Sequence, residues 1–319
     1  MGMAAPAKTT MGIATTSYMT VWRPRGTYEF LEHCHALGSG GIQASLSSLE
    51  SAYVRKVRDR AQQLGMYIEV MGPLPRDDGA QFEAVVKASR DVGAICIRSA
   101  CLGGRRYETF GSLADWDKFV ADSHAAIERA IPILERHKVK LALENHKDWT
   151  AEEFVKLLDK YKSEYLGTCV DTGNNMALLD DPYELVDALA PRAFSTHIKD
   201  MGVTPYPDGF LLSEVPLGEG MLDLKRMVQT IQRAHPEVKM SLEMITRDPL
   251  KIPCFTEKYW VTFPHRNGKF LARMMRLVEP YRGKSLLQMT GLDPEAARKM
   301  EGENVVKCLA YAREKLHGT

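Results

Sequence analysis

The sequence has no long hydrophobic run and no excess of charge of one sign. Its apolar runs stay far below the roughly 20 residues that a membrane-spanning helix needs, so we expect no membrane partner. Lys and Arg total 42 and Asp and Glu total 41, which leaves neither a basic surface for nucleic acid nor a charged tail. The 45% hydrophobic and 26% charged residues are typical of a globular protein.

Closely spaced cysteines and a signal sequence are also absent. None of the six cysteines forms a CxxC pair, and two lie inside apolar, strand-like runs, so we expect free buried thiols rather than disulfides. Residues 1–10 (MGMAAPAKTT) are small and polar and lack the charged-then-apolar pattern of a signal peptide, which predicts a disordered tail. We expect a cytoplasmic protein, with an exported form that has lost its leader as the alternative.

Short apolar runs alternate with longer amphipathic segments along the chain, a pattern typical of repeated βα units around a parallel sheet. Eight such repeats close a (β/α)8 TIM barrel, an α/β fold that we assign to residues 11–280. The expected strands are residues 11–18, 41–47, 66–72, 94–100, 139–144, 166–171, 193–197 and 239–243. The expected helices are residues 28–37, 49–64, 80–92, 116–137, 151–161, 182–190, 222–235 and 268–278. Pro132 lies inside the fourth helix and predicts a kink or a break there.

A doubly wound open sheet is the structural alternative to the barrel. Such sheets usually carry a glycine-rich GxGxxG turn after the first strand. The first expected strand here continues into TSYMTVWRPRG, which contains no such motif. We therefore favour the barrel.

Residues 281–319 predict a C-terminal helical extension. Asp293 followed by Pro294 is a typical helix start, and Val305, Leu309, Ala312 and Leu316 then fall on one helical stripe. The stripe needs a partner surface, which is either the barrel or a second subunit. A homodimer is therefore one interpretation of this segment.

Each of the last four expected strands ends in a potential metal ligand. Glu144, Asp171, His197 and Glu243 close the apolar runs in LALENH, GTCVDTGN, FSTHIKD and MSLEMI. Singly, such an acid is more often a helix cap, and such a histidine a hydrogen-bonded core residue. In a barrel, however, these strand ends meet at one mouth, and unpaired carboxylates buried close together need a cation to neutralise them. We expect one divalent ion, Mn²⁺, Mg²⁺ or Co²⁺, with Zn²⁺ also tolerated.

The motifs LENH, VDTGN, THIKD and VPLGEG and the SLEM strand occur in an order and spacing that resemble a known family. The chain resembles the xylose isomerase-like TIM barrels over about residues 11 to 280. This superfamily includes sugar phosphate isomerases and epimerases and is related to the family-2 AP endonucleases. The additional histidines of the three-zinc DNA-repair branch are missing, so a DNA-repair nuclease is not expected.

The resemblance implies roles for the four ligands. Glu144 and Glu243 would be ligands and also the acid/base pair that removes and returns a proton through an enediolate, while Asp171 and His197 would mainly hold the ion. The implied function is a metal-dependent isomerase or epimerase of a sugar or polyol derivative. A lyase or dehydratase of the same superfamily, acting on an inosose or a 3-oxo-glycoside, is the first alternative. A non-catalytic carbohydrate-binding barrel is the second.

Four further polar residues near the strand ends are candidate substrate contacts. His146 and Lys199 each lie two positions beyond a ligand, on the same side if the strand continues. Arg98 and Arg247 are cations at the expected rim and suit a phosphate or a carboxylate. The alternatives are a loop-bonded rim histidine for His146 and structural ion pairs for the three cations, Asp200 being one partner considered for Lys199.

Asn174 is a fifth candidate contact and marks a departure from the ketose 3-epimerase subgroup. That subgroup has a histidine at the position of Asn174 and an arginine at the position of Val203, and both normally contact substrate. Their absence argues against a free-ketose 3-epimerase without affecting the metal ligands.

Two segments near the expected mouth contain no clear helix or strand pattern. Residues 202–220 (GVTPYPDGFLLSEVPLGEG) predict a long Pro/Gly-rich loop, which in a compact domain is usually functional. The segment after Glu243 carries Phe255, Tyr259, Trp260 and Phe263. These aromatic residues form either a lid wall over a sugar or a simple cover of the rim.

Overall fold

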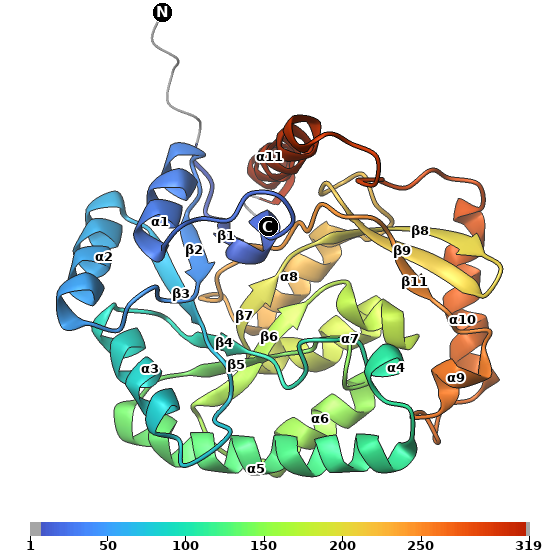
Figure 1. Cartoon of the computed structure of the whole chain (residues 1–319), viewed down its shortest axis with the longest axis horizontal. Coiled ribbons are helices and arrows are strands. Elements are labelled where there is room, and N and C mark those ends of the chain that lie inside the picture. The colour runs from blue at the N-terminus through green and yellow to red at the C-terminus, as the bar shows by residue number, and fades with distance from the viewer. Residues whose placement is uncertain (1–7, 317–319) are drawn as a thin grey trace, which may run out of the picture.

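The computed structural model describes residues 8–316, so residues 1–7 of the predicted tail lie outside the described residues. Eight parallel strands form one sheet in the order β10-β1-β2-β3-β4-β5-β6-β7 (Figure 1). They are β1 (Gly12–Ala14), β2 (Gly41–Ala44), β3 (Tyr67–Met71), β4 (Ile97–Ser99), β5 (Leu141–Glu144), β6 (Leu166–Asp171), β7 (Ala193–His197) and β10 (Ser241–Leu242).

Ile198 joins the two ends of this sheet. Its N–H donates to the carbonyl of Ser241 at 2.8 Å, and its carbonyl accepts from the N–H of Glu243 at 3.1 Å. These bonds close β7 onto β10, so the predicted TIM barrel is confirmed. All eight strands lie within the ranges expected from the sequence, although most are shorter because their ends bend into turns.

Helices alternate with the strands and surround the barrel (Figure 1). Two of the helices begin at a side-chain cap: Thr150 forms a capping box with Glu153, and the side chain of Asp223 accepts from Arg226 N. The helices between strands are α1 (Thr27–Ala36), α2 (Ser51–Leu64), α3 (Ala80–Asp91), α4 (Arg106–Thr109), α5 (Leu113–His137), α6 (Ala151–Lys160), α7 (Pro182–Leu189) and α8 (Leu224–Ala234), with the 3-10 turns η1 (Thr15–Tyr18), η2 (Asn174–Leu178) and η3 (Ala190–Arg192).

The expected kink or break at Pro132 does not interrupt α5, which continues from Leu113 to His137. Pro132 removes one backbone donor, and its ring crowds the preceding turn. Its side chain is exposed, so the carbonyl that loses its partner lies on the solvent side of the helix, where water can replace the bond. The predicted break is therefore wrong, and the alternative of a kink within the continuous helix stays a prediction.

Residues 202–220 are not the long loop that we expected. β8 (Asp200–Tyr206) and β9 (Gly209–Val215) pair antiparallel, and β11 (Leu250–Ile252) adds a third strand to β9. The turn between β8 and β9 is Pro207-Asp208, followed by Gly209 at a φ of 149°. Proline, aspartate and glycine in this order favour a tight turn, and the apolar residues on either side pair as strands. The Pro and Gly content therefore reflected a hairpin turn.

The segment that follows β11 packs most of its aromatic side chains inward. It contains α9 (Glu257–Trp260), α10 (Gly268–Val278) and η4 (Glu279–Tyr281). Tyr259 is buried and stacks on Phe263 at a centroid distance of 5.2 Å, while Trp260 donates to the carbonyl of Cys254. Phe255 is exposed. These contacts match the cover of the rim rather than a wall facing a ligand.

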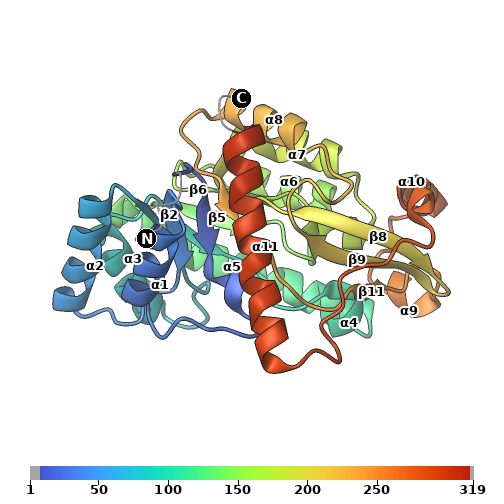
Figure 2. The ribbon, with the colours of Figure 1, turned by 90° about the horizontal axis from the view of Figure 1, so that it is seen from above.

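The C-terminal helix α11 (Pro294–Tyr311) and the turn η5 (Ala312–Leu316) pack on the barrel, and α11 crosses the molecule in Figure 2. Asp293 caps α11, and the predicted apolar stripe is buried. The carboxylate of Glu301 accepts from three backbone N–H groups after η1, those of Thr20, Val21 and Trp22, at 2.9 to 3.1 Å. The helix thus holds the loop that follows β1, and the homodimer remains a prediction.

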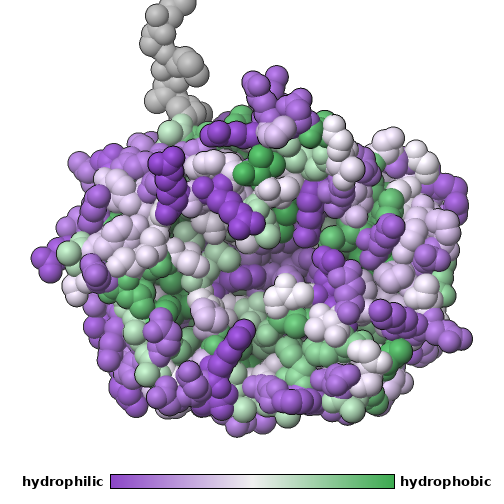
Figure 3. Space-filling model, viewed as in Figure 1, coloured by the Kyte–Doolittle hydropathy of each residue, from purple (hydrophilic) through white to green (hydrophobic). Residues whose placement is uncertain are grey.

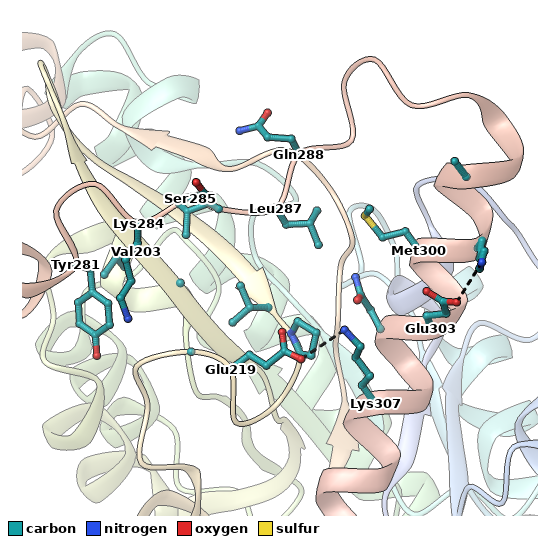
Figure 4. A pocket seen from close by; sticks show the side chains of 18 residues that line it. Val203, Glu219, Tyr281, Lys284, Ser285, Leu287, Gln288, Met300, Glu303 and Lys307 are labelled. Carbon is teal, nitrogen blue, oxygen red and sulfur yellow. Dashed lines mark ion pairs between the residues drawn. The ribbon is translucent and has the colours of Figure 1, made fainter.

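A groove of about 640 Å³ separates α11 from the β8–β9 hairpin (Figure 4). Lys307 and Glu219 form an ion pair of 3.5 Å inside it.

Neither a membrane-spanning helix nor a disulfide occurs within residues 8–316. No helix there is long and apolar enough to cross a membrane, and all six cysteines are free, as expected.

Glu301→Gln should lower the free energy of unfolding by about 2 kcal/mol, because a neutral amide oxygen replaces the carboxylate that accepts three buried hydrogen bonds. Urea denaturation measures the change. Glu303→Gln is the matched control, since Glu303 lies on the same helix but is exposed. Equal stability of the two variants would show that α11 does not depend on the Glu301 contacts.

Candidate metal centre and active site

Four polar side chains meet at the carboxyl-terminal ends of the last strands of the barrel. Glu144 ends β5, Asp171 ends β6, His197 ends β7, and Glu243 follows β10. Their ligand atoms lie within 4.8 Å of one another, and all four residues are buried. Nδ1 of His197 is 3.5 Å from Glu144 Oε1, 3.6 Å from Asp171 Oδ2 and 3.4 Å from Glu243 Oε1. The structure brings together the four residues that the sequence singled out.

The imidazole of His197 is oriented from the interior of the barrel. Its Nε2 lies 2.6 Å from Oε1 of Gln43, an oxygen that can only accept, so Nε2 carries the proton and Nδ1 presents its lone pair to the carboxylates. Gln43 in turn donates to Glu69 at 2.8 Å and to Ser195 at 3.2 Å, which fixes its amide orientation. This is the arrangement that orients metal-binding histidines in other proteins.

The donor set fits one divalent cation. Among the described residues, the buried Nδ1 of His197 has no hydrogen-bond partner, although it faces three carboxylates. Oδ1 of Asp171 accepts from the backbone of Gly173 and Asn174 at 2.9 and 2.7 Å, so Oδ2 is the oxygen turned to the cluster. Three carboxylates and one imidazole suit Mn²⁺, Co²⁺ or Zn²⁺ and accept Mg²⁺.

The carboxylates of the cluster are already paired with protein cations, which corrects part of the sequence argument. Arg98 forms an ion pair with Glu144, and Lys199 pairs with Glu243 and, at 2.8 Å, with Asp171. Burial opposes the ionisation of Asp171, but Lys199 and His197 together outweigh burial and hold the pKa of Asp171 below its usual range. A metal is therefore not required for neutrality, and the case for one rests on the geometry around His197.

The β8–β9 hairpin adds an acidic residue that the sequence did not reveal. Glu214 is buried, accepts from Arg247 at 2.7 and 3.2 Å, and lies 3.9 Å from Lys199. Burial raises and the surrounding cations lower the pKa of Glu214, with a net decrease. Lys147 also lies in this region and donates to Asn174 Oδ1. The sequence predicts a loop over residues 202–220, so it gives no signal that Glu214 lies on a strand facing the cluster.

The predicted substrate contacts fall into two layers. Arg98, His146 and Arg247 line a cavity of about 230 Å³ together with Glu243. Asn174 and Lys199 are almost completely buried and do not line it; Asn174 donates to Glu144 Oε1 at 2.9 Å. Figure 3 shows a hollow with hydrophilic side chains near the centre of the face drawn in Figure 1.

Some structural alternatives considered for these residues are also resolved. Lys199 does not pair with Asp200, whose carboxylate instead accepts from the backbone of the turn after β9, including Gly218 at 2.9 Å and Gly220 at 3.0 Å. The prediction for His146 requires the strand to continue past Glu144. β5 ends at Glu144, but His146 still lines the cavity. Burial, together with Lys147 and Arg98, holds the pKa of His146 well below its usual range, so its imidazole is neutral.

Comparison with known proteins places this arrangement in a family. The model of the xylose isomerase-like TIM barrel matches residues 31–261. The chain belongs to this family. The match includes β2 to β10 and all four residues of the cluster, so the resemblance seen in the sequence motifs is confirmed.

Individual relatives share the fold at low sequence identity. A 3-oxo-isoapionate decarboxylase of Pectobacterium atrosepticum is 26% identical over 247 residues, which span 73% of this chain and 85% of the relative. The structure of a D-psicose 3-epimerase in the presence of D-fructose aligns with a TM-score of 0.62 and 16% identity, covering 97% of this chain and 99% of that chain. The IOLI protein, described with a bound zinc atom, aligns with a TM-score of 0.57 and 15% identity over 86% and 99% of the two chains.

Gln43→Met should weaken metal binding about 10- to 100-fold, because His197 loses the acceptor that orients its ring. Titration calorimetry with Mn²⁺ and Zn²⁺ on protein stripped with a chelator measures the affinity. Gln81→Met, an exposed substitution on α3, is the control. Equal affinity of both variants and the parent protein would show that Gln43 does not support the ligand.

Proposed function

We propose that this protein is a divalent-metal-dependent isomerase or epimerase acting on a sugar-derived carbonyl compound. The observation that carries the proposal is the position of Glu144 and Glu243. They come from β5 and from the end of β10, and each places one oxygen within about 3.5 Å of His197 Nδ1. Two glutamates on different strands around one ligand cluster suit proton removal on one side and return on another.

The residues of the cluster support a two-step proton transfer. One glutamate takes the proton from the carbon next to the substrate carbonyl, and the electron pair of that C–H bond becomes the double bond of an enediolate. For isomerisation, a glutamate returns a proton to the former carbonyl carbon, and the hydroxyl proton of the enediolate passes to the other oxygen. For epimerisation, a proton returns to the opposite face of the carbon that lost it. A divalent ion held by the four ligands would supply Lewis acidity that makes this C–H bond more acidic.

The cations next to the two glutamates can stabilise a negatively charged intermediate. Arg98 and Lys199 are within ion-pair distance of Glu144 and Glu243 and can stabilise an enediolate oxygen in the same region. The neutral imidazole of His146 can donate or accept a hydrogen bond from a substrate hydroxyl at the cavity wall.

Incubation of the metal-loaded protein with a panel of ketoses and oxo-sugar derivatives in D2O should introduce deuterium next to the carbonyl, as followed by NMR. Glu243→Gln should reduce the exchange rate by about 10² to 10⁴, because the amide cannot take up the proton. Glu257→Gln, far from the cluster on α9, should exchange like the parent protein. A metal-loaded protein that binds a sugar but never exchanges would favour the carbohydrate-binding alternative.

A decarboxylating lyase is the second candidate, and two observations favour it. The relative from Pectobacterium atrosepticum is a 3-oxo-acid decarboxylase by name, and Asn174 and Val203 replace the residues typical of ketose 3-epimerases. In this reaction the bond between the carboxylate carbon and its neighbour breaks, CO2 leaves, and the electron pair forms the same enediolate. A glutamate then protonates the carbon.

The two candidates give different products from a 3-oxo sugar acid. A lyase releases one CO2 for each substrate consumed and introduces one solvent deuterium into the product, whereas an isomerase keeps all carbon atoms. A coupled CO2 assay together with mass spectrometry of the product distinguishes them. Complete retention of the carboxyl carbon across a panel of 3-oxo acids would exclude the lyase.

A further inference from the structure

The cavity above the metal cluster is lined by an excess of positive charge. Four of its lining residues are Lys or Arg, and among the described residues Glu243 is the single acidic one that lines it. One of these cations lies on β4 and the other three lie on the separate loops after β4, β5 and β10, so they do not form one solvated charge run. They are Arg98, Arg105, Lys147 and Arg247.

The charged side chains of the cavity wall and of the cluster beneath it balance one another before any metal is added. The carboxylates are Glu144, Asp171, Glu214 and Glu243, and the cations that face them are Arg98, Lys147, Lys199 and Arg247. Binding of a divalent ion therefore leaves about two surplus positive charges in a region with little water. A neutral sugar does not offset this surplus, whereas an anionic substrate does.

Lys147 is the strongest single indication of a missing anion. It is 3% exposed, its ammonium donates to Asn174, and it forms no ion pair with any carboxylate between residues 8 and 316. Burial and the neighbouring Lys199 lower the pKa of Lys147 to about 8, because the surroundings disfavour a charge that no carboxylate pairs with directly. A buried, unpaired ammonium is costly unless a ligand completes its surroundings.

Arg105 lies at the rim and is available for the same anion. Its ion pair with Glu108, at 2.6 Å, involves a half-exposed carboxylate, so water screens it. Arg247, by contrast, is fixed by two hydrogen bonds to buried Glu214, which holds its position in the wall. The cavity next to Glu243 is thus lined by one cation at the rim, Arg105, and by two that hydrogen bonds hold in place, Lys147 and Arg247.

We propose that Lys147, Arg105 and Arg247 form a subsite for the carboxylate of an acidic substrate whose carbonyl end reaches the Glu144–Glu243 cluster. The second half of this statement rests on the proposed function; the anion subsite does not. A planar carboxylate fits a guanidinium fork and an ammonium together. The cavity of about 230 Å³ lies below the 300–1,000 Å³ of drug-sized pockets, which favours a compact sugar acid.

Binding measurements on the Mn²⁺-loaded protein test this subsite without relying on turnover. Titration calorimetry compares threonate and erythronate with threitol and erythritol, in which a neutral hydroxymethyl group replaces the carboxylate. At least one of the two acids should bind about ten times or more as tightly as its matched polyol, which is the ratio expected of a charge-assisted contact. Equal binding of acids and polyols would overturn the proposal.

Two variants locate the effect. Lys147→Gln keeps a donor for Asn174 but removes the charge, and Arg105→Gln removes the charge of a partly exposed rim residue. Each should reduce the acid-to-polyol ratio about five- to tenfold without weakening the binding of the polyol or of Mn²⁺. Arg233→Gln, an exposed substitution on α8, is the control and should keep the full ratio. Retention of the ratio in both test variants would place the anion elsewhere and refute the subsite.

Two further measurements test the type of anion and distinguish the subsite from the proposed reaction. Erythritol 4-phosphate tests the other common oxyanion, and tighter binding of the phosphate than of the acids would overturn the assignment to a carboxylate. Acid binding that follows the variants, without deuterium exchange on any 3-oxo acid, would support the subsite and count against the proposed function.

Discussion

The ion pairs of Lys199 at the carboxyl-terminal end of the barrel hold the site together. Lys199 extends from just beyond β7 and lies between Asp171 and Glu243, with Glu214 at 3.9 Å. Its carboxylates come from β6, the end of β10 and the hairpin, so one ammonium links three parts of the chain. Removing a partner from such a buried group leaves an uncompensated charge, which costs more than the pair itself contributes. The mouth of the barrel is therefore a connected, charge-balanced surface rather than a set of independent side chains.

Hydrogen bonds from Gln43 and from the start of η2 orient two of the ligands. Gln43 connects His197 to Glu69 through the inside of the barrel, so the ring orientation depends on β2 and β3 on the opposite wall. Asp171 receives two backbone N–H groups at the start of η2, which leaves one oxygen directed at the cluster. A site assembled from loops alone would lack these supports.

The charge balance also connects the metal site to the choice of substrate. Because the protein cations already compensate the carboxylates, a divalent ion makes the site an anion acceptor. This holds for an isomerase that keeps the acid group as an anchor and for a lyase that expels it as CO2. In the lyase, cations close to the leaving carboxylate would stabilise the substrate more than the transition state, so strong anchoring by Lys147 would favour the reaction in which the acid is retained.

The sequence by itself determined the barrel, the cap at Asp293, the buried stripe of α11 and the four residues of the cluster. All of these follow from local periodicity, or from the rule that parallel strand ends meet at one mouth. Only the tertiary structure decided which charges meet: Lys199 with Asp171 rather than Asp200, Glu214 with Arg247, and Gln43 with His197. These pairs join residues 28 to 154 positions apart. No periodicity records the distance across a barrel, because it depends on how the strands tilt and on where the hairpin folds back.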